Sequence, residues 1–221
     1  MIRTPQTPPL RLIQTSYVLL ALLPLAWLIR LTANDAWGEE PIAAAQAFTG
    51  SWTLNFLILT LCITPLRSWT QWHWLTRLRR ISGLITFFYG SLHALAYLWL
   101  AQGFAVDATA RDISRHPFIA VGIAAFLLLI PLAATSGKWA VRRLGGRRWQ
   151  ELHRSIYPIA ILGCVHYLWS SKPDELPGAL ASTLIVAGLL GWRARERKRR
   201  AIAVPVSEKP TPLRFYSKRP D

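Results

Sequence analysis

Long apolar runs alternate with short polar connections along the whole chain. The apolar runs lie at Leu12–Leu31, Gly50–Leu66, Arg80–Ala101, Phe118–Thr135, Glu151–Trp169 and Gly178–Trp192. A helix needs about 20 residues to cross the roughly 30 Å of hydrocarbon in a bilayer. Spanning segments must also satisfy their backbone hydrogen bonds internally, which favours helices. The pattern therefore predicts an all-α, polytopic membrane helical bundle with six transmembrane helices.

The two polar ends of the chain flank this bundle. We divide the sequence into an N-terminal segment, 1–11, a six-helix transmembrane domain, 12–192, and a basic tail, 193–221. The tail is charged and rich in proline, a composition typical of disordered segments. The first apolar run is too long for a typical signal peptide and has no clear cleavage site after it. We therefore expect that run to be a retained span.

Basic residues gather in alternate connections, and this bias predicts the orientation of the bundle. Arginine and lysine dominate before the first run, between the second and third, between the fourth and fifth, and after the sixth. Acidic residues dominate the other three connections. Positively charged loops remain in the cytoplasm. Both termini are therefore expected to be cytoplasmic, and the third and fifth spans are expected to run outward.

The overall composition agrees with a membrane protein. Of the 221 residues 52% are hydrophobic, and the formal net charge is +15. The loop bias, together with attraction to anionic lipid headgroups, explains this charge without a nucleic acid partner. Cys62 and Cys164 lie inside apolar runs and match neither a disulfide framework nor a metal-binding pair, so we expect buried thiols.

Two histidines are expected at the same depth of the membrane. Ionisable side chains at this depth are costly and often functional. His93 follows Arg80 by 13 residues and His166 follows Arg154 by 12. At about 1.5 Å per residue, both lie roughly 18–20 Å from the cytoplasmic level. They are expected to face each other toward the outer side, as a bis-imidazole pair suited to haem iron.

A second, inner site would involve His153. The residues opposite it on the third span would be Arg79 and Arg80, and arginine pairs with a haem propionate rather than with iron. His153 and His166 are also about 140° apart around an ideal helix, unless Pro158 kinks it. The sequence therefore leaves one or two haems open.

Other uses of these histidines stay open at this point. A structural zinc site normally needs four ligands, and no further ligand is obviously placed. A transporter often shows repeats and helices broken at the midplane, which we do not find. A haem-free membrane anchor would share the same apolar runs. His73 and His116 are expected to be ordinary surface residues.

Three segments carry a resemblance to a known family. They are TGSWTLNFLILTLCITPLR, RRISGLITFFYGSLHALAYL and ATSGKWAVRRLGGRRWQELHRSIYPIAILGCVHYLWSSK. They resemble the MsrQ, or YedZ, family of haem-binding membrane subunits of the bacterial periplasmic methionine sulfoxide reductase system. That family lies within the ferric-reductase-like transmembrane superfamily, and the resemblance covers nearly the whole membrane region.

The resemblance implies electron transfer in a bacterial inner membrane. It implies that His93, His153 and His166 match haem-associated histidines, with haem b as the cofactor and Arg79 in place of a second histidine on the third span. It implies quinol as the electron donor and a periplasmic molybdopterin-containing methionine sulfoxide reductase catalytic subunit, which repairs oxidised proteins, as the acceptor. FMN is also associated with the family, although no motif here locates it.

No nicotinamide-binding motif is found. Ferric reductases and NADPH oxidases carry a cytoplasmic flavin and nicotinamide domain, whereas no GxGxxG turn occurs here. We therefore expect an electron-transfer subunit that oxidises quinol, or takes electrons from a separate cytosolic flavin reductase, and that reduces no substrate by itself. A direct transmembrane ferric or cupric reductase is the close alternative.

Overall fold

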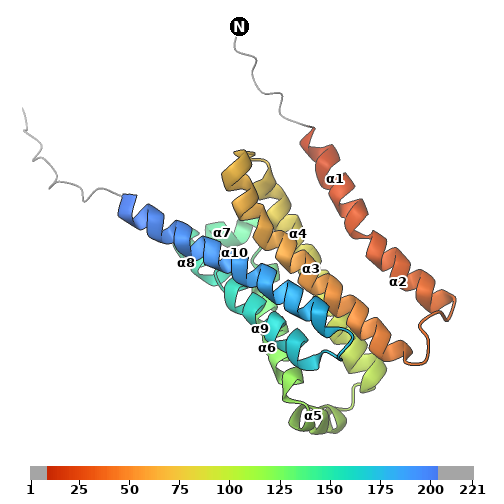
Figure 1. The fold of residues 1–221 in the computed structure, drawn as a ribbon. Coiled ribbons are helices and arrows are strands. Elements are labelled where there is room, and N and C mark those ends of the chain that lie inside the picture. Colours follow the sequence, from red (N-terminus) through yellow and green to blue (C-terminus); the bar gives the residue numbers. More distant parts are fainter. Residues whose placement is uncertain (1–8, 204–221) are drawn as a thin grey trace, which may run out of the picture.

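The computed structural model describes residues 9–203, which form helices joined by short connections (Figure 1). No strand occurs among these residues, which confirms the predicted all-α class. In chain order the helices are α1 Leu10–Ala21, α2 Leu23–Ala33, α3 Pro41–Thr70, α4 Leu75–Leu95, the π-helix η1 Ala96–Ala101, α5 Val106–Arg115, α6 Pro117–Ala134, α7 Lys138–Leu144, α8 Gly146–His153, α9 Ile156–Ser170 and α10 Leu176–Ala203.

Five of the six predicted spans coincide with stretches long and apolar enough to cross a membrane. Within the described residues these stretches are Leu10–Ala33, Pro41–Thr70, Leu75–Ala101, Pro117–Ala134 and Leu176–Arg200. The other predicted span, Glu151–Trp169, is divided between α8 and α9, and α9 has only 15 residues. The count of six spans and the cytoplasmic position of both termini therefore stay predictions.

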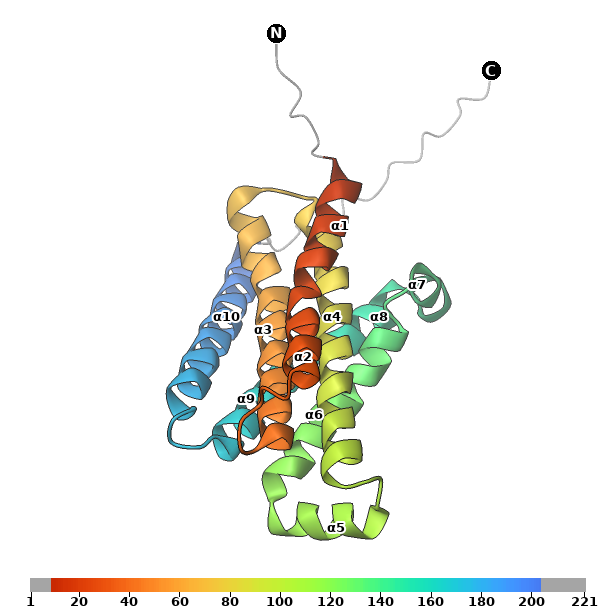
Figure 2. The same ribbon diagram turned by 90° about the vertical axis from the view of Figure 1, so that its right-hand side faces the viewer.

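The connections gather at two ends of the bundle (Figure 2). We call the end with α5 and the connections 34–40 and 171–175 the outer end. We call the opposite end, with the connection 71–74 and the helices α7 and α8, the inner end. These names follow the predicted orientation. The helices α3, α4, α6, α9 and α10 pack against one another between the two ends, and α1 and α2 lie against this group beside α3 and α4.

The apolar core of the bundle lies between α3, α6, α9 and α10. Leu61, Leu129, Ile159 and Cys164 are among its buried members. Cys164 is buried and Cys62 is partly buried, and both thiols are free. This agrees with the expectation that neither cysteine forms a disulfide.

The Tyr89 side chain replaces a missing backbone hydrogen bond in the first span. The helix is interrupted between α1 and α2, next to Pro24, which has no N–H to donate. The Tyr89 hydroxyl donates to the carbonyl oxygen of Ala21 at 2.8 Å and accepts from the Leu25 N–H at 3.1 Å. In an uninterrupted helix these two backbone groups would bond each other. Tyr89 therefore joins the first span to α4.

An arginine side chain satisfies a backbone carbonyl that a proline leaves free in α3. Pro65 lies inside this helix and has no N–H for the carbonyl of Leu61. The Arg193 Nη2 donates to that carbonyl at 2.7 Å and to the Thr64 Oγ1 at 3.0 Å. α10 is thus attached to α3 at the inner end of the bundle.

The last helix corrects the expected start of the C-terminal tail. We expected disorder from residue 193, yet α10 continues to Ala203. Burial of Arg193 against α3 and the Glu196–Arg200 pair, at 2.9 Å and one turn apart, both support this extension. The expected tail beyond 203, and residues 1–8 of the expected N-terminal segment, lie outside the described residues.

Candidate functional site

His93 is held by a backbone group of a neighbouring helix. It lies near the end of α4, and its Nδ1 is 3.0 Å from the carbonyl oxygen of Gln46 in α3. The Thr49 Oγ1 is also within 3.5 Å of this nitrogen. Because a carbonyl can only accept, the hydrogen bond to Gln46 requires the proton on Nδ1. The lone pair of the imidazole is then on Nε2.

His166 is likewise held by a backbone carbonyl of a neighbouring helix. It lies in α9, and its Nδ1 is 2.8 Å from the carbonyl oxygen of Phe118 in α6. Here too the hydrogen bond requires the proton on Nδ1 and leaves the lone pair on Nε2. Metal-binding histidines in proteins almost always have such a partner on their second nitrogen, because it fixes the tautomer and the ring orientation.

The two rings face each other. The ring centroids of His93 and His166 are 6.0 Å apart, and the ring planes are inclined by 75°. The described residues contain no cluster of three or more His, Cys, Asp or Glu side chains able to hold a metal. A haem iron needs no more than two side-chain ligands from the protein, and these two imidazoles are the residues that could hold it.

Two glycines make room for these rings. A Cβ atom added at Gly50 would lie 3.1 Å from the Cε1 of His93. A Cβ atom at Gly122 would lie 2.8 Å from both the Cε1 and the Nδ1 of His166, closer than real contacts allow. Glycine at both positions lets α3 and α6 approach the imidazoles closely enough for their carbonyls to bond them.

The inner histidine is in a different setting. His153 ends α8, and its Nδ1 is 3.1 Å from the carbonyl of Trp149 in the same helix. Its ring stacks on Trp149 at 4.0 Å between centroids. Arg79 lies within electrostatic range of His153. The structure thus brings His93 and His166 together, but it brings no second histidine to His153.

A break in the helix changes the geometric argument about His153 and His166. α8 ends at His153 and α9 begins at Ile156. Pro158 cannot donate to the carbonyl four residues earlier, that of Arg154, and the break lies at this point. Arg154 and Ser155 keep helical backbone angles, and the N–H of Tyr157 bonds the Arg154 carbonyl at 3.1 Å. This tighter turn interrupts the regular helix between the two histidines, so the phase of one ideal helix is not preserved.

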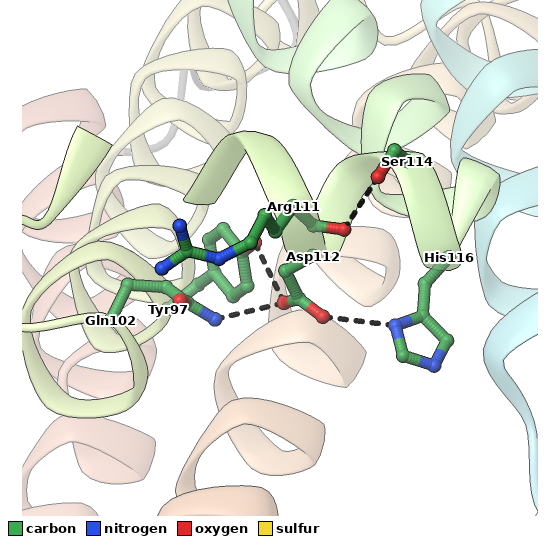
Figure 3. A network of polar contacts seen from close by, with 6 residues as sticks. All are labelled: Tyr97, Gln102, Arg111, Asp112, Ser114 and His116. Atoms are coloured by element: carbon green, nitrogen blue, oxygen red, sulfur yellow. Dashed lines mark hydrogen bonds and ion pairs between the residues drawn. The ribbon is translucent and has the colours of Figure 1, made fainter. Parts of the chain in front are cut away.

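A carboxylate network centred on Asp112 lies at the outer end (Figure 3). The Asp112 Oδ2 accepts hydrogen bonds from the Tyr97 hydroxyl at 2.9 Å and the Gln102 Nε2 at 2.8 Å. The Asp112 Oδ1 pairs with the His116 Nδ1 at 2.9 Å. Tyr97 follows His93 by one helical turn. The network therefore ties the segment after His93 to α5 and to the start of α6.

Sequence reasoning missed most of this supporting structure. His116 was expected to be an ordinary surface residue, and it is about half exposed yet paired with Asp112. The carbonyl groups of Gln46 and Phe118 have no signal in a sequence, because every residue carries a carbonyl. Gly50 and Gly122 did carry a signal, since glycine inside an apolar span often marks close packing.

The fold and the site define a multi-pass helical membrane protein with two facing histidines anchored from neighbouring helices. Comparison with known proteins agrees with this class. Residues 49–164 match the model of the family described as ferric reductase like transmembrane component.

Curated relatives narrow the class to one family. Proteins named protein-methionine-sulfoxide reductase heme-binding subunit MsrQ are similar to this chain. The relative from Azospira oryzae is 52% identical, covering 88% of this chain and 84% of the relative. Those from Herminiimonas arsenicoxydans and Ralstonia nicotianae are 45% and 47% identical, covering 87% and 84% of this chain and 92% and 87% of the relatives. The chain therefore belongs to the MsrQ family, as its resemblance indicated, and is a multi-pass protein of the bacterial inner membrane.

Proposed function

We propose that the protein is the haem b-binding electron-transfer subunit of a methionine sulfoxide reductase system. The observation that carries this proposal is the His93–His166 pair, with ring centroids 6.0 Å apart and both Nδ1 atoms bonded to backbone carbonyls. The relatives are named as heme-binding subunits, which supports the same cofactor. No substrate reduction by this chain alone is required.

The residues of the site have separate tasks. His93 and His166 would hold the haem through their Nε2 atoms, and the carbonyls of Gln46 and Phe118 would keep each imidazole in one tautomer and orientation. A bound haem supplies reversible one-electron chemistry that no amino-acid side chain here offers. His153 and Arg79 are the candidates for cofactor contacts at the inner end, with Arg79 suited to a propionate.

The direction of electron flow follows from the predicted orientation. The paired histidines lie toward the outer end, which borders α5 and the connections 34–40 and 171–175. Electrons would therefore leave on the periplasmic side, to a molybdopterin-containing methionine sulfoxide reductase catalytic subunit. Quinol is the proposed donor, because it is soluble in the membrane; a cytosolic flavin reductase is the alternative donor.

The test is a spectrum of the purified full-length protein combined with a choice of reductants. We expect a Soret band, a pyridine haemochrome typical of haem b, and reduction by a quinol analogue. NADPH alone should not reduce the haem. A colourless protein would contradict the proposal and favour a transporter or an anchor. Rapid reduction of ferric chelates without any protein partner would favour a direct metal reductase.

The same purified protein allows a matched control for the ligands. Haem per protein should fall in His93→Ala and His166→Ala and remain unchanged in His73→Ala, because His73 is exposed in the connection between α3 and α4. An equal loss in all three variants would indicate general instability rather than loss of a ligand.

A further inference from the structure

A buried arginine at the inner end has an N–H donor without a hydrogen-bond partner in the described part of the chain. Arg193 is only 8% exposed, and its Nη1 donates to the Tyr157 hydroxyl at 3.0 Å. Its Nη2 is used by α3, at the carbonyl of Leu61 and the hydroxyl of Thr64. The Nε of Arg193 is buried without a hydrogen-bond partner among the described residues. Since a buried polar group without a partner is costly, a bound acceptor near this N–H would stabilise the protein.

A second guanidinium group lies against the same tyrosine. Arg197, one turn further along α10, has its Nη2 3.5 Å from the Tyr157 hydroxyl. The guanidinium carbons of Arg193 and Arg197 both lie 5.3 Å from the centroid of the Tyr157 ring. Arg79 approaches from α4, partly buried and within electrostatic range of Arg193 and Tyr157. In the described part of the chain, Arg79 has no side-chain hydrogen bond.

The three positive charges have no carboxylate partner in residues 9–203. None of the ion pairs there includes Arg79, Arg193 or Arg197. Glu196, next to Arg197 in sequence, is paired with Arg200 at 2.9 Å, and Glu151 in α8 is paired with Arg147 at 3.2 Å. Like charges at a partly desolvated site disfavour one another, and an anion bound between them would compensate this cost.

We propose that Arg79, Arg193 and Arg197, with the Tyr157 hydroxyl, form a binding site for a phosphate group. The guanidinium group matches phosphate oxygens with parallel N–H donors. The Tyr157 hydroxyl accepts from Arg193, so its own hydrogen remains to be donated to the anion. Arg197 is exposed, which leaves the site open at the inner surface of the bundle.

The phosphate can come from two sources. One is the headgroup of an anionic lipid, because basic pockets between transmembrane helices on the cytoplasmic side bind such headgroups. The other is a soluble phosphate ester, which reaches the site through its open side. Arg79 is also a candidate for a cofactor contact under the proposed function, whereas Arg197 is not. Loss of phosphate binding in Arg197→Gln with unchanged haem content therefore separates this proposal from the proposed function.

The experiment measures binding to the purified full-length protein in detergent. In one arm, phosphatidylglycerol is titrated against phosphatidylcholine and the bound lipid is counted by native mass spectrometry. In the other arm, inorganic phosphate is titrated against chloride at equal ionic strength and the midpoint of thermal unfolding is followed. Saturable retention of phosphatidylglycerol alone assigns a lipid headgroup, whereas a saturable rise of the midpoint with phosphate assigns a soluble ester.

Charge-matched variants decide whether the cluster is responsible. Arg79→Gln and Arg197→Gln remove donors that no backbone group uses, and each should weaken binding about tenfold, as expected for lost hydrogen bonds to a charged group. The control is Arg195→Gln, which removes an exposed charge from the same helix and should leave binding unchanged. No saturable binding in either arm, or equal weakening in the control, overturns the proposal.

Discussion

The outer and inner ends of the bundle place their histidines in different surroundings. At the outer end, His93 and His166 each bond a carbonyl of another helix, so four helices fix the pair. At the inner end, the Nδ1 of His153 lies 3.1 Å from the carbonyl of Trp149 in its own helix, and no second histidine lies beside it in residues 9–203. Only the outer end brings two imidazoles together, which is the arrangement that the proposed haem requires. The comparison therefore puts the weight of the proposal on the outer pair.

The largest effect that would test this difference is loss of the ligands themselves. We expect His93→Ala and His166→Ala each to lower haem affinity by well over tenfold, a change larger than that for loss of a supporting group. His153→Ala should retain most of the haem. The measurement is haem per protein by pyridine haemochrome. Complete loss of haem in His153→Ala would show that the two ends do not differ in this way.

A smaller effect is expected from the glycine beside His166. Gly122→Ala places a Cβ where the structure has 2.8 Å to the imidazole, so the ring must shift from the Phe118 carbonyl. We expect a fall of roughly tenfold in haem affinity, typical of a lost supporting contact. Gly188→Ala is the matched control, because its added Cβ meets nothing within 4 Å. Haem titration of both apo-proteins is the check, and equal affinities would contradict the tight fit at Gly122.

The carboxylate network at the outer end should contribute mainly to stability. Asp112→Asn removes the charge that Tyr97, Gln102 and His116 share, and we expect a loss of about 1–2 kcal/mol in the free energy of unfolding. Asp107→Asn is the control, since Asp107 pairs only with Arg111 at the surface. Thermal unfolding in detergent measures both. A similar loss in the two variants would remove any special role of the network.

The smallest effect should come from the exposed pair that joins two outer connections. The Lys172 Nζ lies 2.8 Å from the Glu40 Oε2, and this contact lowers the pKa of Glu40 below its ordinary 4.5. The contribution is therefore present at neutral pH and lost as the pH falls through the lowered pKa. Screening makes such exposed pairs weak. We expect Glu40→Gln to leave the unfolding midpoint unchanged at physiological salt; a clear drop would mean that the loops are coupled more tightly.

The sequence predicted the features that depend on pattern. Apolar runs and the charge bias of the loops follow directly from the cost of polar groups in lipid, so the helical bundle and most spans were predicted correctly. The common depth of His93 and His166 followed from counting residues along parallel helices. Their contact in the structure agrees with that count.

The sequence could not predict features that depend on backbone groups or on where helices break. The hydrogen-bond partners of the two histidines are backbone carbonyls, which every residue type carries. The sequence named Pro158 as a candidate kink between the two histidines, but it could not show that the helix is interrupted at Arg154 and Ser155. The burial of Arg193 was hidden because the run RARERKRR reads as a solvated tail, and only the free carbonyl left by Pro65 explains why its first arginine is buried.

The side-chain hydrogen bonds of Tyr89 and Arg193 have a consequence for how the protein is made. The first span enters the membrane with the carbonyl of Ala21 and the N–H of Leu25 unsatisfied, and their partner, Tyr89, is synthesised more than sixty residues later. The carbonyl of Leu61 remains unsatisfied even longer, because its partner Arg193 lies in α10, 132 residues further along the chain. Unsatisfied backbone groups are costly in lipid. We therefore expect the first span and α3 to stay close to the insertion machinery until α10 is inserted. A chain truncated before α10 should be degraded by membrane proteases.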